Sequence, residues 1–299
     1  MNSATILQSV SRSFALCIPL LEDNKVKEVE NMYLLSRVAD TIEDSSLSKE
    51  RKKQLMRDFF GTIGSQDRVE NFVNDLKDGI IDAHDKVLAV KENYQIILDT
   101  FHSMEKDVQE VSLQLLGEMS SGMIKFLDKE IEFFEDLDEY CYYVAGTVGL
   151  YMNRLVRIKD NVHLDEKKAV ILGRYLQKVN VIKNFCKDVS EGRKFWPTEL
   201  KGEKMEMLNR MIENAKSEAT MSFEYIASVP YKLSGYRKFL LLSTLMATEN
   251  IKLMRNNVDV FTNTNGVKIP RNRMSEIFAM VEEAAVSNDS MWKFVGELS

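Results

Sequence analysis

Proline is almost absent from the first two thirds of this 299-residue chain. The chain contains four prolines, and none lies between Pro19 and Pro197. A proline inside a helix removes a backbone hydrogen bond and clashes with the preceding turn, so a proline-free stretch of this length favours long helices. Apolar residues recur at helical spacing along most of the chain, and no repeat, linker or change of composition marks a second domain. The sequence therefore predicts an all-α protein with one helical domain over residues 1–299.

Helical spacing of the apolar residues also predicts where the main elements lie. We expect helices, in chain order, over 26–43, 85–101, 137–157, 167–189 and 271–286, the last of which would end the fold. The stretch 191–197 contains a glycine and a proline and breaks the helical spacing, so it is predicted to be a loop.

Composition and charge describe an ordinary soluble protein. Hydrophobic residues make up 44% of the chain and charged residues 29%, and the net charge of −6 gives no basic footprint for nucleic acid. The three cysteines are odd in number and have no metal-type spacing, so we expect reduced thiols in a cytoplasmic protein. The longest apolar run, 239–247, is too short to cross a bilayer. If the substrate is a lipid, we expect transient contact with the membrane surface.

Acidic residues gather on one face of the helix predicted over 26–43. At 3.6 residues per turn, Tyr33, Arg37, Asp40 and Asp44 stack above one another, and Glu43 lies on the flank. Acidic residues are frequent in this chain, so a solvated helix face is one explanation. The apolar surroundings favour another, because clustered carboxylates there need a neutralising partner and oxygen ligands suit Mg²⁺. An arginine beside them suits a diphosphate, which needs cations and hydrogen-bond donors.

A second polar ladder occurs in the helix predicted over 167–189. Asn180, Asn184 and Asp188 recur there at intervals of four residues, with Lys183 beside them. The ladder is either an ordinary polar stripe or a weaker metal site, because an amide oxygen can coordinate Mg²⁺ but brings no charge. Two such helices facing each other would hold a metal-bridged diphosphate. That arrangement points to chemistry on a prenyl diphosphate.

Three further segments allow two interpretations each. Residues 11–14 form either a helix cap or a set of hydroxyl and guanidinium donors to a diphosphate. The segment 140–149 contains two glycines, each costing about 1 kcal/mol within a helix, so it serves either close packing or a cavity whose aromatic walls stabilise a carbocation. The loop 191–197 either ends a helix or closes over an anionic substrate or a reducing nucleotide. No G-x-G-x-x-G motif occurs in the chain.

Taken together, these segments resemble the squalene/phytoene synthase family of head-to-head trans-prenyltransferases. The resemblance rests on five motifs that follow one another in the family's order, at residues 11–14, 33–44, 122–129, 140–149 and 177–197. The segments 127–129, 177–180 and 195–197 are similar to the squalene synthase branch. The sequence Tyr-Val-Ala-Gly-Thr-Val-Gly at 143–149 is also similar to phytoene synthases.

The resemblance implies a single-domain isoprenoid synthase bundle with a central cavity, and we expect the protein to be a monomer. It implies that two farnesyl diphosphates are condensed through presqualene diphosphate, with Mg²⁺, and that NADPH reduces this intermediate to squalene. The implied catalytic residues are Asp40, Asp44 and Tyr140, which matches a tyrosine implicated in proton removal. The implied metal ligands are Asp40, Glu43, Asp44, Asn180, Asn184 and Asp188. The implied diphosphate contacts are Ser11, Arg12, Arg37, Lys183 and Arg193. The implied pocket residues are Phe14, Tyr33, Val144, Ala145, Gln177 and Phe239.

Several departures from the family pattern keep other outcomes open. Asn184 stands where the family usually has an aspartate, Ser45 where squalene enzymes commonly add an acid, and Ser243-Thr244 where they tend to have Pro-Gln. The C-terminal membrane helix of the eukaryotic enzymes is not found in this sequence. The reaction could therefore stop at presqualene diphosphate, give a dehydrosqualene- or phytoene-type or other terpene product, or use another prenyl chain. A non-catalytic helical protein that binds prenyl diphosphates is the remaining alternative.

Overall fold

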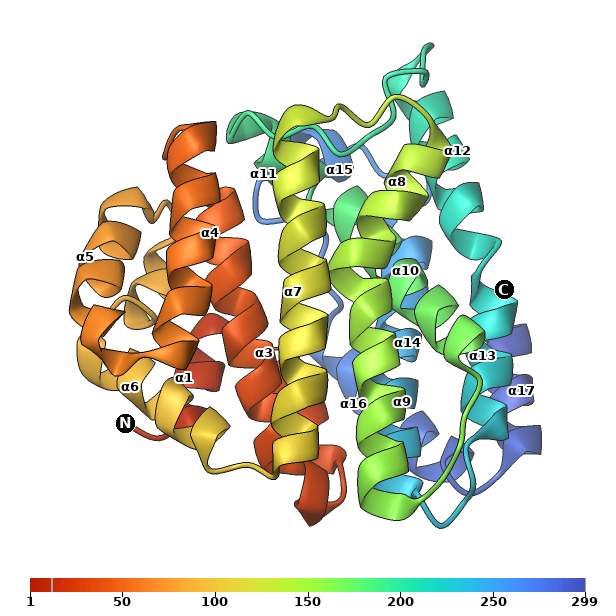
Figure 1. Cartoon of the computed structure of the whole chain (residues 1–299). Coiled ribbons are helices and arrows are strands. Elements are labelled where there is room, and N and C mark those ends of the chain that lie inside the picture. The colour runs from red at the N-terminus through yellow and green to blue at the C-terminus, as the bar shows by residue number, and fades with distance from the viewer. Residues whose placement is uncertain (12, 299) are drawn as a thin grey trace. The chain divides into compact units, whose positions relative to one another are not determined.

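The protein is described here by a computed structural model, in which residues 1–11 and 13–298 are placed. Every regular element in these residues is a helix, which confirms the predicted all-α class (Figure 1). The chain divides into two compact units, and each is described by itself. Unit 1 comprises Met1–Pro19, Asp23–Lys129 and Ile158–Asp160, and unit 2 comprises Leu20–Glu22, Glu130–Arg157 and Asn161–Ser299.

Unit 1 is built around the 22-residue helix α3, which packs against α1, α4, α6 and α7. The apolar side of α3 is fully buried, with Leu35, Val38 and Ile42 each 0% exposed. Burial of this apolar side stabilises the helix more than its intrinsic propensity does. The elements of this unit are α1 (Ser3–Val10), α2 (Phe14–Cys17), α3 (Asp23–Asp44), α4 (Lys49–Gly64), η2 (Gln66–Arg68), α5 (Val69–Gly79), η3 (Ala83–Val87), α6 (Lys91–His102) and α7 (Lys106–Asp128). A short 3₁₀ turn, η1 (Ile18–Leu20), precedes α3.

Unit 2 is built around α10, which packs against α8, α12, α13, α14 and a π-helical segment labelled η4. Its elements are α8 (Phe134–Cys141), η4 (Tyr142–Gly146), α9 (Thr147–Asp160), α10 (Glu166–Lys183), α11 (Phe185–Ser190), α12 (Lys204–Lys216), α13 (Ala219–Ser228), α14 (Ser234–Met254), α15 (Asp259–Thr262), α16 (Arg271–Ala284) and α17 (Asn288–Leu298). The last three residues of α9 belong to unit 1.

The glycines of the 140–149 segment serve close helix packing. A side-chain carbon built on Gly149 would collide with the carbonyl of Ala169, and one built on Gly173 would collide with the carbonyl of Ala145. The backbones of η4 and α9 therefore lie directly against the backbone of α10, which no residue larger than glycine would allow at these positions. Of the two interpretations of this segment, its glycines support close packing.

The structure differs from the predicted helices at four places, one of which is the turn at Asn184 that splits the helix expected over 167–189 into α10 and α11. The helix expected over 85–101 is instead the short 3₁₀ turn η3 followed by α6, and Asp82 caps the start of η3 by accepting a hydrogen bond from the His84 amide at 3.0 Å. The helix expected over 137–157 is interrupted by the π-helical turn of η4. The helix over 271–286 does not end the fold, because α17 follows it.

Two further observations concern membrane-spanning helices and the cysteines. No helix within residues 1–11 and 13–298 is both long enough and apolar enough to span a membrane. The three cysteines Cys17, Cys141 and Cys186 are free thiols, as predicted. Burial raises the pKa of Cys17 to about 12, so this thiol stays protonated and unreactive at neutral pH.

Candidate functional site

The first acidic motif lies on the C-terminal half of α3 in unit 1, as predicted. Arg37, Asp40 and Asp44 follow one another at intervals of three and four residues in a regular helix, so they share one face. The Asp40 side chain is 39% exposed and the Arg37 side chain 22% exposed, and their nearest charged atoms are 4.0 Å apart. Glu43 and Asp44 are half-buried. This face of α3 therefore offers accessible carboxylate oxygens beside a cation.

Arg37 is held by a residue that sequence reasoning missed. Its Nε and Nη2 atoms donate to the two carboxylate oxygens of Asp85, each at 2.9 Å. Asp85 lies in η3 and its side chain is 3% exposed. Burial raises the pKa of Asp85, and the Arg37 guanidinium opposes that rise. Burial lowers the pKa of Arg37, but the carboxylates of Asp40 and Asp85 more than offset it, so Arg37 stays charged.

Two aromatic rings and a hydroxyl lie beside this face. The rings of Phe14 and Tyr33 approach to 4.9 Å between centroids. Ser11 ends α1, and its hydroxyl accepts a hydrogen bond from the Phe14 amide at 3.1 Å. Burial raises the pKa of Tyr33, and a hydrogen bond with Ser11 opposes it. The structure thus brings together Ser11, Phe14 and Tyr33, whereas the predicted diphosphate contact Arg12 lies outside the described residues.

Glu43, on the flank of the first motif, has a cation nearby. The Lys52 ammonium donates to the backbone carbonyl of Glu43 at 2.6 Å. Burial lowers the pKa of Lys52, and the Glu43 carboxylate opposes that shift. Lys52 from α4 thus lies at the C-terminal end of α3, where a cation also meets the negative end of the helix dipole.

The second motif lies in unit 2 and spans two helices instead of the one predicted. α10 ends at Lys183, Asn184 is a turn residue, and α11 begins at Phe185. The predicted interval of four is kept across the turn, because the Asn184 amide donates to the Asn180 carbonyl and the Asp188 amide to the Asn184 carbonyl, each at 2.9 Å. The Asn184 side-chain amide also donates to the Asn180 side-chain oxygen at 3.1 Å.

Asp188 is the buried carboxylate of the second motif. Its side chain is 11% exposed and lies 2.8 Å from Nη2 of Arg193, which also binds Glu191 at 2.5 Å. The Arg193 amide donates to the Asp188 carbonyl at 2.8 Å, so the loop after α11 folds back on the motif. Burial raises the pKa of Asp188 to about 7, with repulsion from Glu191 adding to it and Lys187 opposing it. Asp188 and Arg193 are therefore brought together as expected of one site.

Lys183 is the last residue of α10 and is half-buried. Burial lowers the pKa of Lys183. The carbonyl of Lys183 faces Gly266, whose left-handed backbone (φ 65°) places no side chain against it. A loop from the C-terminal part of unit 2 therefore packs directly on the second motif.

Tyr140 is buried at 4% exposure at the C-terminal end of α8. Its ring stacks on Phe195 with centroids 4.8 Å apart and 23° between planes. Arg193 in turn lies 5.9 Å from the Phe195 ring. Trp196, 7% exposed, contacts Phe185 of α11 at 4.3 Å between centroids. The predicted loop 191–197 is confirmed, and it links Tyr140 to Asp188 through two side chains.

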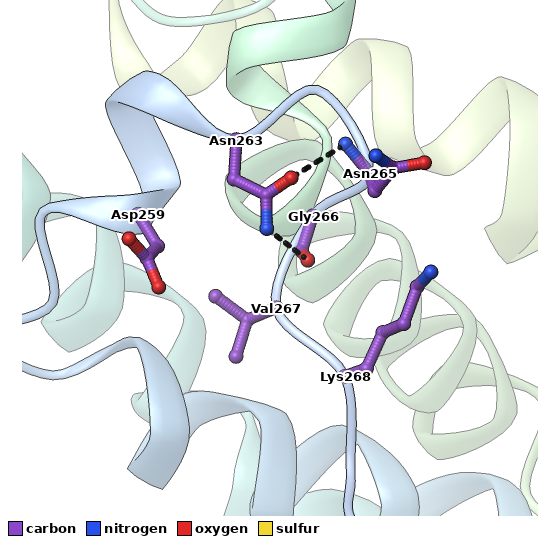
Figure 2. Close-up of a pocket in the computed structure, with 6 residues that line it drawn as sticks. All are labelled: Asp259, Asn263, Asn265, Gly266, Val267 and Lys268. Carbon is purple, nitrogen blue, oxygen red and sulfur yellow. Dashed lines mark hydrogen bonds between the residues drawn. The ribbon is translucent and has the colours of Figure 1, made fainter.

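The remaining predicted pocket residues all lie in unit 2. Val144 and Ala145 are in η4, Gln177 is in α10, and Phe239 is in α14 at 7% exposure, stacked with Tyr236. A cavity of about 490 Å³ in the same unit has other walls, shown in Figure 2: Asp259, Asn263, Asn265, Gly266, Val267 and Lys268. The Asn263 side chain is used within this loop, accepting from the Asn265 amide and donating to the Gly266 carbonyl.

A cluster of four charged side chains near Cys141 was also missed by sequence reasoning. Arg174 and Lys178, one turn apart on α10, each form ion pairs with both Asp138 and Glu218, at 2.5–3.1 Å. Lys178 is 2% exposed and Glu218 is 8% exposed. The four-residue interval between Arg174 and Lys178 is the only feature of the sequence that indicates this cluster. Their partners come from α8 and from the residue before α13, which spacing along α10 cannot reveal.

The donor chemistry of the first motif fits Mg²⁺. Within the described residues, no group of three or more His, Cys, Asp or Glu side chains is arranged to hold a metal ion. Mg²⁺ is commonly bound by one or two carboxylates together with water and substrate phosphates, so two carboxylates one turn apart are sufficient. The residues that would hold it are Asp40 and Asp44, which are in part exposed.

Solved structures of other proteins share the fold of this chain. A solved structure described as the complex of TcSQS with the ligand BPH1237 matches 99% of this chain and 90% of its own, with a TM-score of 0.82 and 27% identity. A dehydrosqualene synthase structure shares the fold at a TM-score of 0.61 and 20% identity, over 94% of each chain. The chain therefore has the all-α terpenoid synthase fold.

Comparison of sequences identifies the family of this chain. The family model for squalene/phytoene synthase matches residues 7–273, and the chain belongs to that family. Squalene synthase of Rattus norvegicus is 29% identical over 274 residues, covering 85% of this chain and 64% of the rat protein. Squalene synthase 1 of Arabidopsis thaliana is 29% identical over 287 residues, covering 86% of this chain and 65% of the plant protein. The chain thus spans a little under two thirds of the length of these relatives.

Proposed function

We propose that this protein is a prenyltransferase that condenses two farnesyl diphosphates head-to-head through presqualene diphosphate and reduces that intermediate to squalene with NADPH. The observation that carries the proposal is the α3 face, where Arg37, Asp40 and Asp44 lie together in a member of the squalene/phytoene synthase family. A prenyl diphosphate is also the kind of substrate that accessible carboxylates beside a fixed arginine suit.

In this proposal the first motif meets the leaving diphosphate. Asp40 and Asp44, supported by Glu43, would hold Mg²⁺, which when bound neutralises the charge that develops on the diphosphate. Asp188 with Asn180 and Asn184 would form the weaker second set. The diphosphate oxygens would be bound by Ser11, Arg12, Arg37, Lys183 and Arg193. That both motifs serve one substrate stays a prediction.

Tyr140 is proposed to remove the proton lost as the cyclopropane ring closes. Its burial against Phe195 supports this role, because a phenol shielded from water keeps a defined orientation and excludes competing proton donors. Phe14, Tyr33, Val144, Ala145, Gln177 and Phe239 are proposed to line the prenyl pocket. Aromatic faces such as those of Phe14 and Tyr33 stabilise a nearby carbocation through the ring quadrupole.

The reductive half-reaction is the finer part of the proposal. The loop 191–197 was the candidate cover for a nucleotide, but the side chains of Arg193 and Phe195 are engaged within unit 2. Arg193 binds Asp188 and Glu191, and Phe195 stacks on Tyr140. These two side chains therefore do not form a ready-made site for NADPH. We also propose a single functional domain over 1–299, a monomer, and a cytoplasmic protein in transient contact with the membrane surface.

Product analysis tests this function. The protein is incubated with farnesyl or geranylgeranyl diphosphate and Mg²⁺, with and without NADPH, and the products are extracted and identified by mass spectrometry. Squalene from farnesyl diphosphate with NADPH is the expected product. Presqualene diphosphate alone, dehydrosqualene or phytoene would support the condensation and overturn the reductive step. No condensation product from either substrate, with tight substrate binding, would instead identify a non-catalytic binding protein.

A further inference from the structure

We propose that Asp85 is a positioning residue for diphosphate binding, which sets the guanidinium of Arg37 in the one orientation that serves the first motif. The inference rests on the proposed function and deepens it. It assigns a role to a residue that lies 48 positions away from Arg37 in the chain and outside every motif of the sequence.

Two hydrogen bonds between Arg37 and Asp85 fix the orientation of the Arg37 guanidinium group. Nε and Nη2 of Arg37 each donate to a different oxygen of Asp85, at 2.9 Å. Such a two-point contact sets the guanidinium plane as well as its position, which a single hydrogen bond does not. The third nitrogen, Nη1, then lies on the side of Asp40, at 4.0 Å from its carboxylate. Arg37 therefore presents Nη1 along α3 toward the motif.

Asp85 is itself held rigidly. Its amide donates to the Asp82 carbonyl at 3.1 Å, and its carbonyl accepts from the Leu88 amide at 2.9 Å. Leu88 is 0% exposed and anchors the end of the turn, while Asn93 donates to the Val87 carbonyl at 3.0 Å. The turn η3 also packs against α1. With its side chain 3% exposed, Asp85 has little room to move, so the orientation of Arg37 follows from the backbone of η3.

A purely structural role is the competing explanation. The pair also ties η3 to α3, and a buried ion pair broken on one side destabilises a protein whatever its function. Unit 1 contains a matched pair that separates the two explanations. Lys25, in the first turns of α3, is 0% exposed and lies 2.7 Å from Asp160, whose side chain is 16% exposed. This second pair ties α3 to a neighbouring segment without touching the first motif.

The test compares Asp85→Asn with the matched variant Asp160→Asn, using the full chain and inorganic pyrophosphate with Mg²⁺ as the probe. Calorimetry measures the pyrophosphate Kd, steady-state assays measure KM and kcat for farnesyl diphosphate, and thermal melting measures Tm. We expect Asp85→Asn to raise the pyrophosphate Kd and the KM by about tenfold. Asp160→Asn should lower Tm and leave the Kd unchanged.

A double variant shows whether Asp85 acts through Arg37. Arg37→Gln should weaken pyrophosphate binding by a similar factor, and Arg37→Gln with Asp85→Asn should weaken it no further, since the two residues form one unit. Should Asp85→Asn fold poorly, Asp85→Glu keeps the charge, moves it by one methylene, and is expected to raise the Kd while Tm stays near the wild-type value.

The results that would overturn the inference are distinct from those that would overturn the proposed function. A folded Asp85→Asn or Asp85→Glu variant with wild-type pyrophosphate affinity and KM would leave Asp85 with a structural role only. Additive losses in the double variant would also contradict it. A wild-type protein that neither binds pyrophosphate with Mg²⁺ nor condenses farnesyl diphosphate would remove the proposed function, and the inference with it.

Discussion

The two acidic motifs of this protein are built in opposite ways. In unit 1, Asp40 and Asp44 lie on one uninterrupted helix of 22 residues, and the nearest cation to Asp40 on that helix, Arg37, is 4.0 Å away. In unit 2 the chain turns at Asn184 before Asp188, and Asp188 is buried against Arg193 at 2.8 Å. The first motif lies on one face of a regular helix with partly exposed carboxylates, whereas the second is a turn closed by its own cation.

The difference shows which other segments of the chain each motif needs. A regular helix places residues four apart on one face with no help from other segments, so the first motif needs only α3 and a fixed arginine. The second motif needs a turn, a loop that folds back and an ion pair, because a single buried carboxylate is costly without a partner. We therefore expect substitutions in the first motif to affect chemistry, and substitutions in the second to affect stability as well.

The largest effect is expected from Asp40→Asn. Loss of one carboxylate from the first motif should lower turnover by at least about 10²-fold, because the charge on the leaving diphosphate is met less well, while helix content stays intact. Steady-state assays with farnesyl diphosphate and circular dichroism measure both. The matched control is Asp75→Asn, whose carboxylate is 40% exposed and pairs with Arg51. Near-normal activity of a folded Asp40→Asn protein would contradict the metal assignment.

Tyr140→Phe should have a comparable or slightly smaller effect, confined to the rate. Phenylalanine keeps the ring stacked on Phe195 and loses only the hydroxyl, so Tm should change little while formation of presqualene diphosphate falls by about 10²-fold. Tyr94→Phe is the control, because it also removes a buried hydroxyl, one bonded to Thr62 at 2.6 Å. Equal rates of intermediate formation in wild type and Tyr140→Phe would leave Tyr140 with a packing role.

Arg193→Gln tests whether the second motif depends on its internal cation. Removing the guanidinium leaves the buried Asp188 carboxylate without this cation and close to the half-buried Glu191, so we expect a loss of about 2 kcal/mol in the free energy of unfolding, measured in urea. Lys238→Gln breaks the more exposed pair with Glu282 and should cost less than about 0.5 kcal/mol. If both variants lost the same stability, the contrast between the motifs would have no energetic basis.

The smallest effect is expected from Asn184→Asp, which makes the second motif more like the first. A second carboxylate beside Asp188 should tighten Mg²⁺ binding, so half-maximal rate should need several-fold less Mg²⁺ than in the wild type. The measurement is the Mg²⁺ dependence of the initial rate. Identical dependence in both proteins would mean that position 184 does not touch the metal.

Local patterns in the sequence were sufficient for much of the fold and for half of the candidate site. The proline-free stretch and the apolar spacing predicted long helices, and α3 and α7 have 22 and 23 residues. The stacking of Arg37, Asp40 and Asp44 was predictable because it depends only on helix geometry. The turn at Asn184 was not, since helical hydrogen bonds continue across it and the four-residue interval is the same with or without it.

Contacts between segments that lie far apart in the chain were decided only by the tertiary structure. Asp85 meets Arg37 across 48 residues, and Glu218 meets Arg174 and Lys178 from outside their helix. No spacing rule links such pairs, because their proximity follows from how helices pack and not from the period of one helix. The sequence by itself determined which side chains share a helix face and which glycines permit close approach. The fold determined which of those side chains are held in place, because only packing brings the partner that holds them.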